Sequence, residues 1–227
     1  MGWRLMVEYS WGVGTTKRAG GRRFDREHGV TTQALLFLSE LGTSRSEAYA
    51  HVTHYEPVPV AEFRDLVRRV PKEAMRDATF VDVGAGMGRA VLVAREYPFK
   101  QIVGIELSPH LYEIARDNLA KARGFTVACR DVRLIRADAR RRRFPRGDLV
   151  VFLYNPFDGQ ALDGVLDRID DARGNTTWIL YHTPVHAERV IGRGYEAVAT
   201  LPGGIVYKLS RSAMNDSISS MASAGAK

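Results

Sequence analysis

Hydrophobic and polar positions follow two different spacings along this chain. Residues 60–70 repeat apolar side chains every three or four positions, and Pro71 ends the run, which predicts an amphipathic helix. From Thr79 onward, short runs rich in β-branched residues alternate with helical patterns. That alternation is typical of βαβ units and predicts a parallel sheet.

The predicted strands cover residues 79–83, 101–106, 132–136, 149–154 and 176–182. Helices are expected over 87–97, from Pro109 onward with Ser108 as N-cap, and over 158–170. Residues 195–201 and 204–209 flank Pro202 and Gly203, a pattern that predicts a terminal β-hairpin. We therefore expect an α/β fold with a mostly parallel seven-stranded sheet, a C-terminal antiparallel hairpin, and helices on both faces.

The two ends of the chain lack a regular spacing. Residues 1–44 mix aromatic side chains with a basic, glycine-rich run, and there we expect loops and one short helix around 32–41. The last residues are rich in Ser, Ala and Met and predict a disordered tail. We divide the chain into an N-terminal extension or lid over 1–58, a catalytic core over 59–211 and a tail over 212–227.

Composition narrows the functional classes. The chain has 33 Lys and Arg against 26 Asp and Glu, and this net charge of +7 permits an acidic partner without requiring one. The single cysteine, Cys129, has no disulfide partner, and His51 and His54 lack a third ligand residue, so no metal is expected. No apolar run reaches the roughly 20 residues that cross a bilayer, and residues 1–10 do not resemble a signal peptide. We expect a cytoplasmic protein without a membrane partner.

The strongest motif lies at the first strand-to-helix turn, where Asp82 precedes Gly84, Gly86 and Gly88. Glycines at such a turn let the backbone lie against a ligand, and the following helix presents free N–H groups. Glu106 ends the next strand, 22 residues after Gly84. A carboxylate at that place can accept hydrogen bonds from two hydroxyls of a ribose.

NAD and S-adenosylmethionine both contain such a ribose, so Glu106 alone does not choose between them. A dinucleotide fingerprint requires a small residue at position 89, where this chain has Arg89, and the third glycine falls at Gly88 instead. This form favours S-adenosylmethionine, with Asp82 near the methionine end of the cofactor.

Residues 79–160 resemble the class I S-adenosylmethionine-dependent methyltransferases, which have a Rossmann-like fold. The segment from Asp82 to Gly88 resembles their motif I, and Glu106 resembles the acidic end of motif II. Segments 24–31 and 55–57 are similar to a bacterial group whose substrates are largely unassigned. The resemblance implies a cofactor site formed by Asp82, Gly84, Ala85, Gly86, Gly88, Glu106, Leu107, Asp138, Ala139 and Asn155.

Asp138 and Ala139 follow the third strand, where such enzymes bind the adenine amino group. An aspartate in this position is alternatively a turn former. Arg140–Arg143 form a charge run without the interleaved aromatic residues that stack on bases, and such a run is more often a solvated loop than a nucleic-acid contact.

Candidate acceptor residues lie at the tips of the fourth and fifth strands. Tyr154, Asn155 and His182 are the catalytic candidates, and Tyr154, Phe157 and His28 are expected to contact the substrate. The Asn155 carbonyl can accept from an amino group and Phe157 can stack on a planar acceptor, although Asn155-Pro156 is alternatively a plain strand-ending turn.

We therefore expect methyl transfer to a nitrogen or oxygen of an unidentified acceptor, with a small molecule favoured. One alternative is a protein lysine methyltransferase of the non-SET histone type, which residues 80–88 and 103–106 also resemble. Another is a non-catalytic module that binds S-adenosylmethionine or RNA. A protein or nucleic-acid substrate and the oligomeric state stay open at this point.

Overall fold

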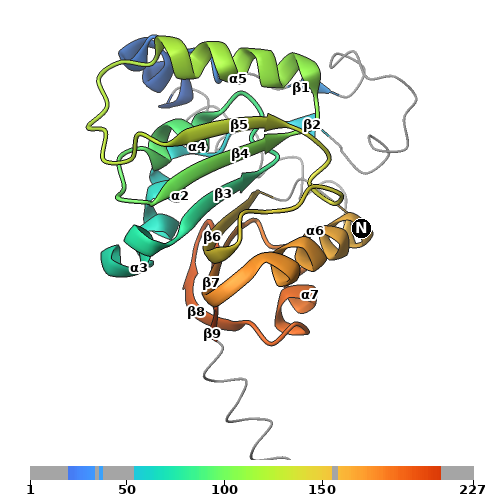
Figure 1. Cartoon of the computed structure of the whole chain (residues 1–227). Helices are drawn as coiled ribbons and strands as arrows, with labels where there is room; N and C mark the ends of the chain where they lie inside the picture. Colours follow the sequence, from blue (N-terminus) through green and yellow to red (C-terminus); the bar gives the residue numbers. More distant parts are fainter. Residues whose placement is uncertain (1–19, 34–35, 38–53, 155–157, 211–227) are drawn as a thin grey trace, which may run out of the picture.

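A seven-stranded sheet forms the centre of the protein (Figure 1). The computed structural model describes residues 20–33, 36–37, 54–154 and 158–210. In spatial order the strands are β5 (Val132–Arg136), β4 (Gln101–Glu106), β3 (Thr79–Val83), β6 (Gly147–Tyr154), β7 (Arg173–His182), β9 (Gly204–Ser210) and β8 (Glu196–Leu201). Strands β5 to β7 are parallel, and β9 pairs antiparallel with β7 and β8. The predicted sheet with its terminal hairpin is confirmed.

Helices cover both faces of the sheet, as expected (Figure 1). On one face, α2 (Val60–Val67) and α4 (Arg89–Ala94) pack through Phe63, Leu66 and Leu92 onto the even-numbered residues of β3 and β6. On the other face, α6 (Gly159–Ala172) packs onto the odd-numbered residues of the same strands. Because side chains alternate along a strand, both faces of these central strands are buried and apolar.

Local signals place the helix starts. Ser108 caps α5 (Pro109–Lys121) by accepting a hydrogen bond from the Leu111 N–H at 3.4 Å, and Pro109 occupies the first turn. Asp158 caps α6 in the same way through the Ala161 N–H at 2.9 Å. The α5 start agrees with the sequence prediction, and α6 begins one residue later than predicted, because the cap itself is not helical.

Four segments have a secondary structure other than the predicted one, and the helix predicted over 87–97 is shorter, as α4. Residues 20–28 are helical although loops were expected, and Leu36–Phe37 form a short strand, β1, that pairs with β2 (His54–Tyr55) where a helix was expected. The helices α3 (Lys72–Asp77) and α7 (Ala187–Ile191) were not predicted. The sequence did not predict α3 because Pro71 indicated only the end of the preceding helix, whereas this proline is also the N-cap of α3.

Within the described ranges, no helix is long and apolar enough to cross a membrane. The same residues contain no group of three or more His, Cys, Asp or Glu side chains arranged to hold a metal ion. The expected C-terminal tail lies outside the described residues.

Candidate functional site

Three parallel strands end side by side at the candidate site. Strand β6 lies between β3 and β7, with Asp82 opposite Phe152 and Tyr154 opposite His182. Alternation along the strands places Asp82, Tyr154 and His182 on the same face of the sheet. The sheet order therefore brings together residues that lie up to 100 positions apart in the sequence.

The glycine turn after β3 adopts backbone angles that only glycine takes easily. Gly84, Gly86 and Gly88 have φ angles of 79°, 56° and 86°. Glu106 stabilises this turn, because its carboxylate accepts hydrogen bonds from the Gly86 N–H and the Ser108 N–H, both at 2.7 Å. Glu106 is only 7% exposed, and burial raises its pKa. The Leu107 N–H also donates to this carboxylate, so three backbone groups hold it in place beside the turn.

Asp82 is the most perturbed carboxyl group at the site. Its side chain is 3% exposed, and its Oδ2 atom has no hydrogen-bond partner. Burial, with a contribution from the charge of Glu106, raises the pKa of Asp82 to about 8. A buried polar atom without a partner is uncommon in folded proteins, and a strongly shifted carboxyl in a cavity is typical of a functional site.

A cavity of about 410 Å³ joins the glycine turn to the tips of β6 and β7. The glycine turn, the strand tips, the start of α4 and residues 55–58 form its walls. The other lining residues are Asp82, Gly84, Ala85, Arg89, Ala90, Phe152, Tyr154, His182 and Thr183. Polar and apolar side chains are mixed in it, as is usual for small-molecule sites.

Tyr154 and His182 contact each other in this cavity. The ring of Tyr154 stands edge-on to the imidazole, with centroids 4.3 Å apart. His182 is 2% exposed, and its Nε2 atom lies 2.7 Å from Glu62 Oε2 on α2. Burial and the neighbouring Glu56 raise the pKa of the Tyr154 phenol, so this group stays protonated at neutral pH.

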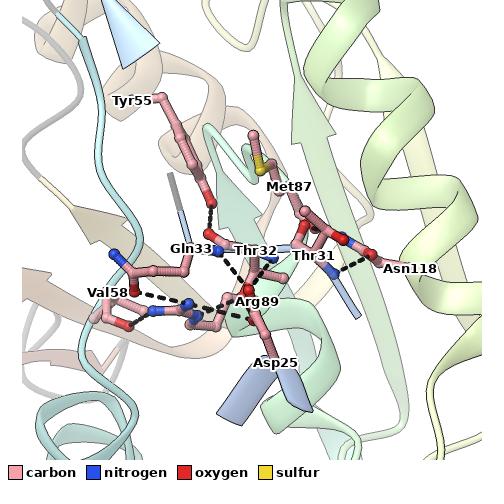
Figure 2. Close-up of polar contacts among 9 residues, drawn as sticks. All are labelled: Asp25, Thr31, Thr32, Gln33, Tyr55, Val58, Met87, Arg89 and Asn118. Atoms are coloured by element: carbon pink, nitrogen blue, oxygen red, sulfur yellow. Dashed lines mark hydrogen bonds and ion pairs between the residues drawn. The ribbon is translucent and has the colours of Figure 1, made fainter. Parts of the chain in front are cut away.

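Arg89 connects α4 to residues 25–33, a contact that the sequence did not predict (Figure 2). Its guanidinium is 3% exposed, donates to Thr32 Oγ1 at 2.7 Å, and lies 3.5 Å from Asp25 Oδ1. Asp25 in turn accepts hydrogen bonds from the N–H groups of Thr32 and Gln33 at 2.8 and 2.7 Å. The sequence contains one sign of this role, an arginine where a dinucleotide site needs a small residue. Of its partners, Asp25 lies in segment 24–31 and Thr32 directly follows that segment.

Tyr55 closes the glycine turn from outside. A side chain on Gly86 would collide with the Tyr55 ring, so glycine is required there for space as well as for its backbone angle. The Tyr55 hydroxyl donates to the Thr32 carbonyl at 2.9 Å (Figure 2). Asn118 on α5 links the same segment to the turn, because its amide donates to the carbonyls of Thr31 and Met87 at 2.7 and 2.9 Å.

Other predicted site residues lie elsewhere. Asp138 is bound by Arg140, whose guanidinium donates to Oδ2 at 2.7 Å and whose N–H donates to Oδ1 at 3.0 Å, while Arg141–Arg143 are exposed. His28 does not line the cavity; its ring stacks on Phe125 with centroids 4.0 Å apart, and its Nδ1 contacts the Arg123 carbonyl. Asn155 and Phe157 lie outside the described residues.

Comparisons with known proteins agree with this geometry. Residues 81–155 match a family described as a methyltransferase domain. The fold is similar to that of a proposed RNA methyltransferase from Pyrococcus horikoshii, with a TM-score of 0.50, 14% identity, and coverage of 67% of this chain and 83% of that one. It is also similar to a pyocyanin biosynthetic protein, with a TM-score of 0.51, 20% identity, and coverage of 66% of this chain and 54% of that one. Identities this low establish the fold alone, and no curated protein sequence matches the chain.

Fold and family match together define a class I methyltransferase domain with a Rossmann-like sheet. The family match covers residues 81–155, and this domain is that of an S-adenosylmethionine-dependent methyltransferase.

Proposed function

We propose that this enzyme methylates a nitrogen or oxygen atom of a small molecule that binds in the 410 Å³ cavity. The observation that carries the proposal is the continuity of this cavity, because one space is lined both by the glycine turn with Asp82 and by Tyr154 and His182. A cofactor held at the first wall therefore faces an acceptor held at the second.

The described residues fit S-adenosylmethionine. The unpartnered carboxyl oxygen of Asp82 suits the amino group at the methionine end, and the Glu106 carboxylate, held in place by backbone N–H groups at the tip of β4, suits the ribose hydroxyls. Gly84, Ala85, Gly86 and Gly88 would let the cofactor approach the backbone, and Leu107 and Ala139 would lie along the adenosine. When bound, the cofactor supplies an electrophilic methyl group on a positively charged sulfur.

Asp138 remains our candidate for the adenine amino group. Its carboxylate is engaged by Arg140, which also holds its pKa below the usual range against the opposing effect of burial. Arg140 donates to both oxygens of Asp138, so an adenine amino group would share one of these acceptors. Arg140 would then orient Asp138 and would not contact a nucleic acid.

Acceptor binding is assigned to the tips of β6 and β7. The Tyr154 phenol stays protonated and can donate a hydrogen bond, while His182 is held in a fixed orientation by Glu62. Asn155 and Phe157 follow in the sequence and stay candidates on the sequence alone. We omit His28 from this wall because its ring packs against Phe125.

We also propose that the N-terminal extension over 1–58 acts as a cover for the site in the core over 59–211. Residues 55–58 line the cavity, and residues 20–33 are held beside the glycine turn by hydrogen bonds to Tyr55 and Arg89. An extension over 1–58 would thereby cover the core over 59–211 and keep water out of the site. The tail over 212–227 has no part in this proposal.

Calorimetry with S-adenosylhomocysteine and, as a matched control, NAD tests the cofactor half of the proposal. Incubation with a methyl-labelled cofactor and cell extract, separated into small-molecule and macromolecule fractions, tests the acceptor half. We expect binding of S-adenosylhomocysteine alone and label in the small-molecule fraction. Label confined to protein or RNA would overturn the assignment to a small acceptor, and binding of NAD in its place would overturn the cofactor site.

A further inference from the structure

A row of polar groups lies beside the acceptor end of the cavity and is not explained by cofactor binding. Glu62 Oε2 lies 2.7 Å from His182 Nε2, and Thr183 Oγ1 lies 3.0 Å from His182 Nδ1. Glu62 belongs to α2, whereas His182 and Thr183 end β7, so tertiary packing alone brings the row together. His182 and Thr183 both line the cavity.

The partners of His182 decide which ring nitrogen carries the proton. An ionised Glu62 can only accept, so Nε2 must donate to it, and the neutral imidazole then leaves Nδ1 as an acceptor. Thr183 can donate its hydroxyl proton to that atom. The row Thr183, His182, Glu62 is therefore a path along which a proton leaves the cavity toward Nδ1.

The backbone at Thr183 supports a functional role for this row. Thr183 has a φ angle of +49° and is the only residue other than glycine with positive φ in the described part of the chain. A β-branched residue in this region is strained, and such strain gathers at functional sites. Here the strained turn brings the Thr183 hydroxyl next to the imidazole.

The charges around the cavity favour a positively charged acceptor. Glu56 lines the cavity and accepts a hydrogen bond from the Tyr154 hydroxyl at 3.3 Å, and Glu62 stands behind His182. Arg89, the one arginine among the described residues of the wall, is paired with Asp25 and held by Thr32. Asp82 also lines this space, but its carboxyl group is assigned to the cofactor and is not counted among these charges. Tyr55, Phe152 and Tyr154 add aromatic rings, which attract cations.

We propose that the acceptor is a small molecule with a primary or secondary amine, bound as an ammonium ion by Glu56 and deprotonated through Thr183 by His182, with Glu62 as the positioning residue. This inference rests on the proposed function, because it names the acceptor class of the same site.

The chemistry balances without another reactant. The ammonium proton passes to His182 Nδ1, and the free lone pair of the amine forms a bond to the methyl carbon. The carbon–sulfur bond breaks with its electron pair going to sulfur, and the proton on His182 is released to water afterwards. The positive charge of the sulfonium favours loss of the ammonium proton, because like charges in one cavity disfavour each other.

Binding of three probes to the protein saturated with S-adenosylhomocysteine tests the acceptor class. Benzylamine, benzyl alcohol and benzoate share one ring and differ in charge. We expect calorimetry to show benzylamine binding at least about tenfold more tightly than the other two, and Glu56→Gln to remove most of that preference. Glu73→Gln removes an exposed carboxylate from α3, which precedes the N-terminal end of β3 and so lies away from the strand tips, and it should leave the preference unchanged.

Equal or tighter binding of benzoate or benzyl alcohol would overturn the amine assignment. Failure of S-adenosylhomocysteine to bind in the first titration would instead overturn the proposed function, so the two failures are distinct.

Nuclear magnetic resonance of ¹⁵N-histidine-labelled protein tests the role of Glu62. We expect the His182 signal, identified by its loss in His182→Gln, to show the tautomer with the proton on Nε2. Glu62→Asp should keep this pattern and Glu62→Gln should change it. A proton on Nδ1 in the unaltered protein refutes the path even if no variant folds.

Discussion

Asp82→Asn is the most informative single substitution at this site. Asparagine keeps the shape of the side chain and removes the charge, in a position that is 3% exposed and has a pKa near 8. An unfolded chain ionises aspartate near pH 4, so the folded protein must retain a proton that the unfolded chain has lost. The contribution of Asp82 to stability is complete below about pH 4 and is lost as the pH rises toward 8.

The size of the effect follows from the shift. A pH of 7 lies about three units above the pKa of aspartate in the unfolded chain. At about 1.4 kcal/mol per unit, keeping Asp82 protonated in the folded protein lowers its stability at pH 7 by at most roughly 4 kcal/mol. Water entry and relaxation reduce such costs in real proteins, so we expect Asp82→Asn to stabilise the ligand-free protein by about 2–3 kcal/mol at pH 7. The same variant should bind S-adenosylhomocysteine at least about tenfold more weakly, because the positively charged amino group loses a carboxyl group that ionises when the ligand binds.

Urea unfolding from pH 5 to 8.5 measures the first effect, and calorimetry measures the second. The stability difference between variant and parent should grow with pH and level off above about pH 8. Asp77→Asn, an exposed carboxylate at the end of α3, is the matched control and should change neither quantity. A variant that is less stable than the parent at pH 7, or a difference independent of pH, refutes the reasoning.

Three further predictions concern the same region. Glu106→Gln should weaken S-adenosylhomocysteine binding by about 2–3 kcal/mol in calorimetry, because a charged acceptor for the ribose is lost; unchanged affinity would remove Glu106 from the site. Arg89→Met should release residues 20–33 from the core, with a loss of about 2–4 kcal/mol in the free energy that holds this segment in place. Amide hydrogen exchange in residues 20–33 should become faster, and unchanged exchange would show that Arg89 does not hold the segment. Replacing Arg141–Arg143 with glutamine should alter cofactor affinity by no more than a few tenths of a kcal/mol, since these side chains are exposed, and a larger change in calorimetry would count against the solvated-loop interpretation.

Strand positions were predictable because their signals are local. Strands β3, β4 and β5 have the boundaries that the sequence predicts, since each combines a short β-rich run with a clear turn. The β6 and β7 strands begin two and three residues earlier than predicted, at Gly147 and Arg173. Their early residues are polar and pair with each other through the sheet, which no apolar pattern reveals.

The cofactor motif was also predictable, because its residues are close together in the sequence. Gly84, Gly86 and Gly88 need positive φ angles that glycine alone adopts easily, and Glu106 follows at the tip of the next strand. The acceptor side was predicted only in part. His182 was found from its place at a strand end, but Glu62 was not, because nothing near residue 62 indicates that α2 lies over β7.

By itself, then, the sequence determined the order of the elements, the glycine turn and the class of cofactor, all of which depend on neighbours along the chain. Tertiary structure alone decided that Arg89 joins Asp25 and Thr32, that Tyr55 covers Gly86, and that Glu62 fixes His182. These contacts join segments separated by 31 to 120 positions in the sequence, and their partners are ordinary polar residues with no periodic pattern. Only the packing of helices and extension against the sheet brings such groups within hydrogen-bond distance.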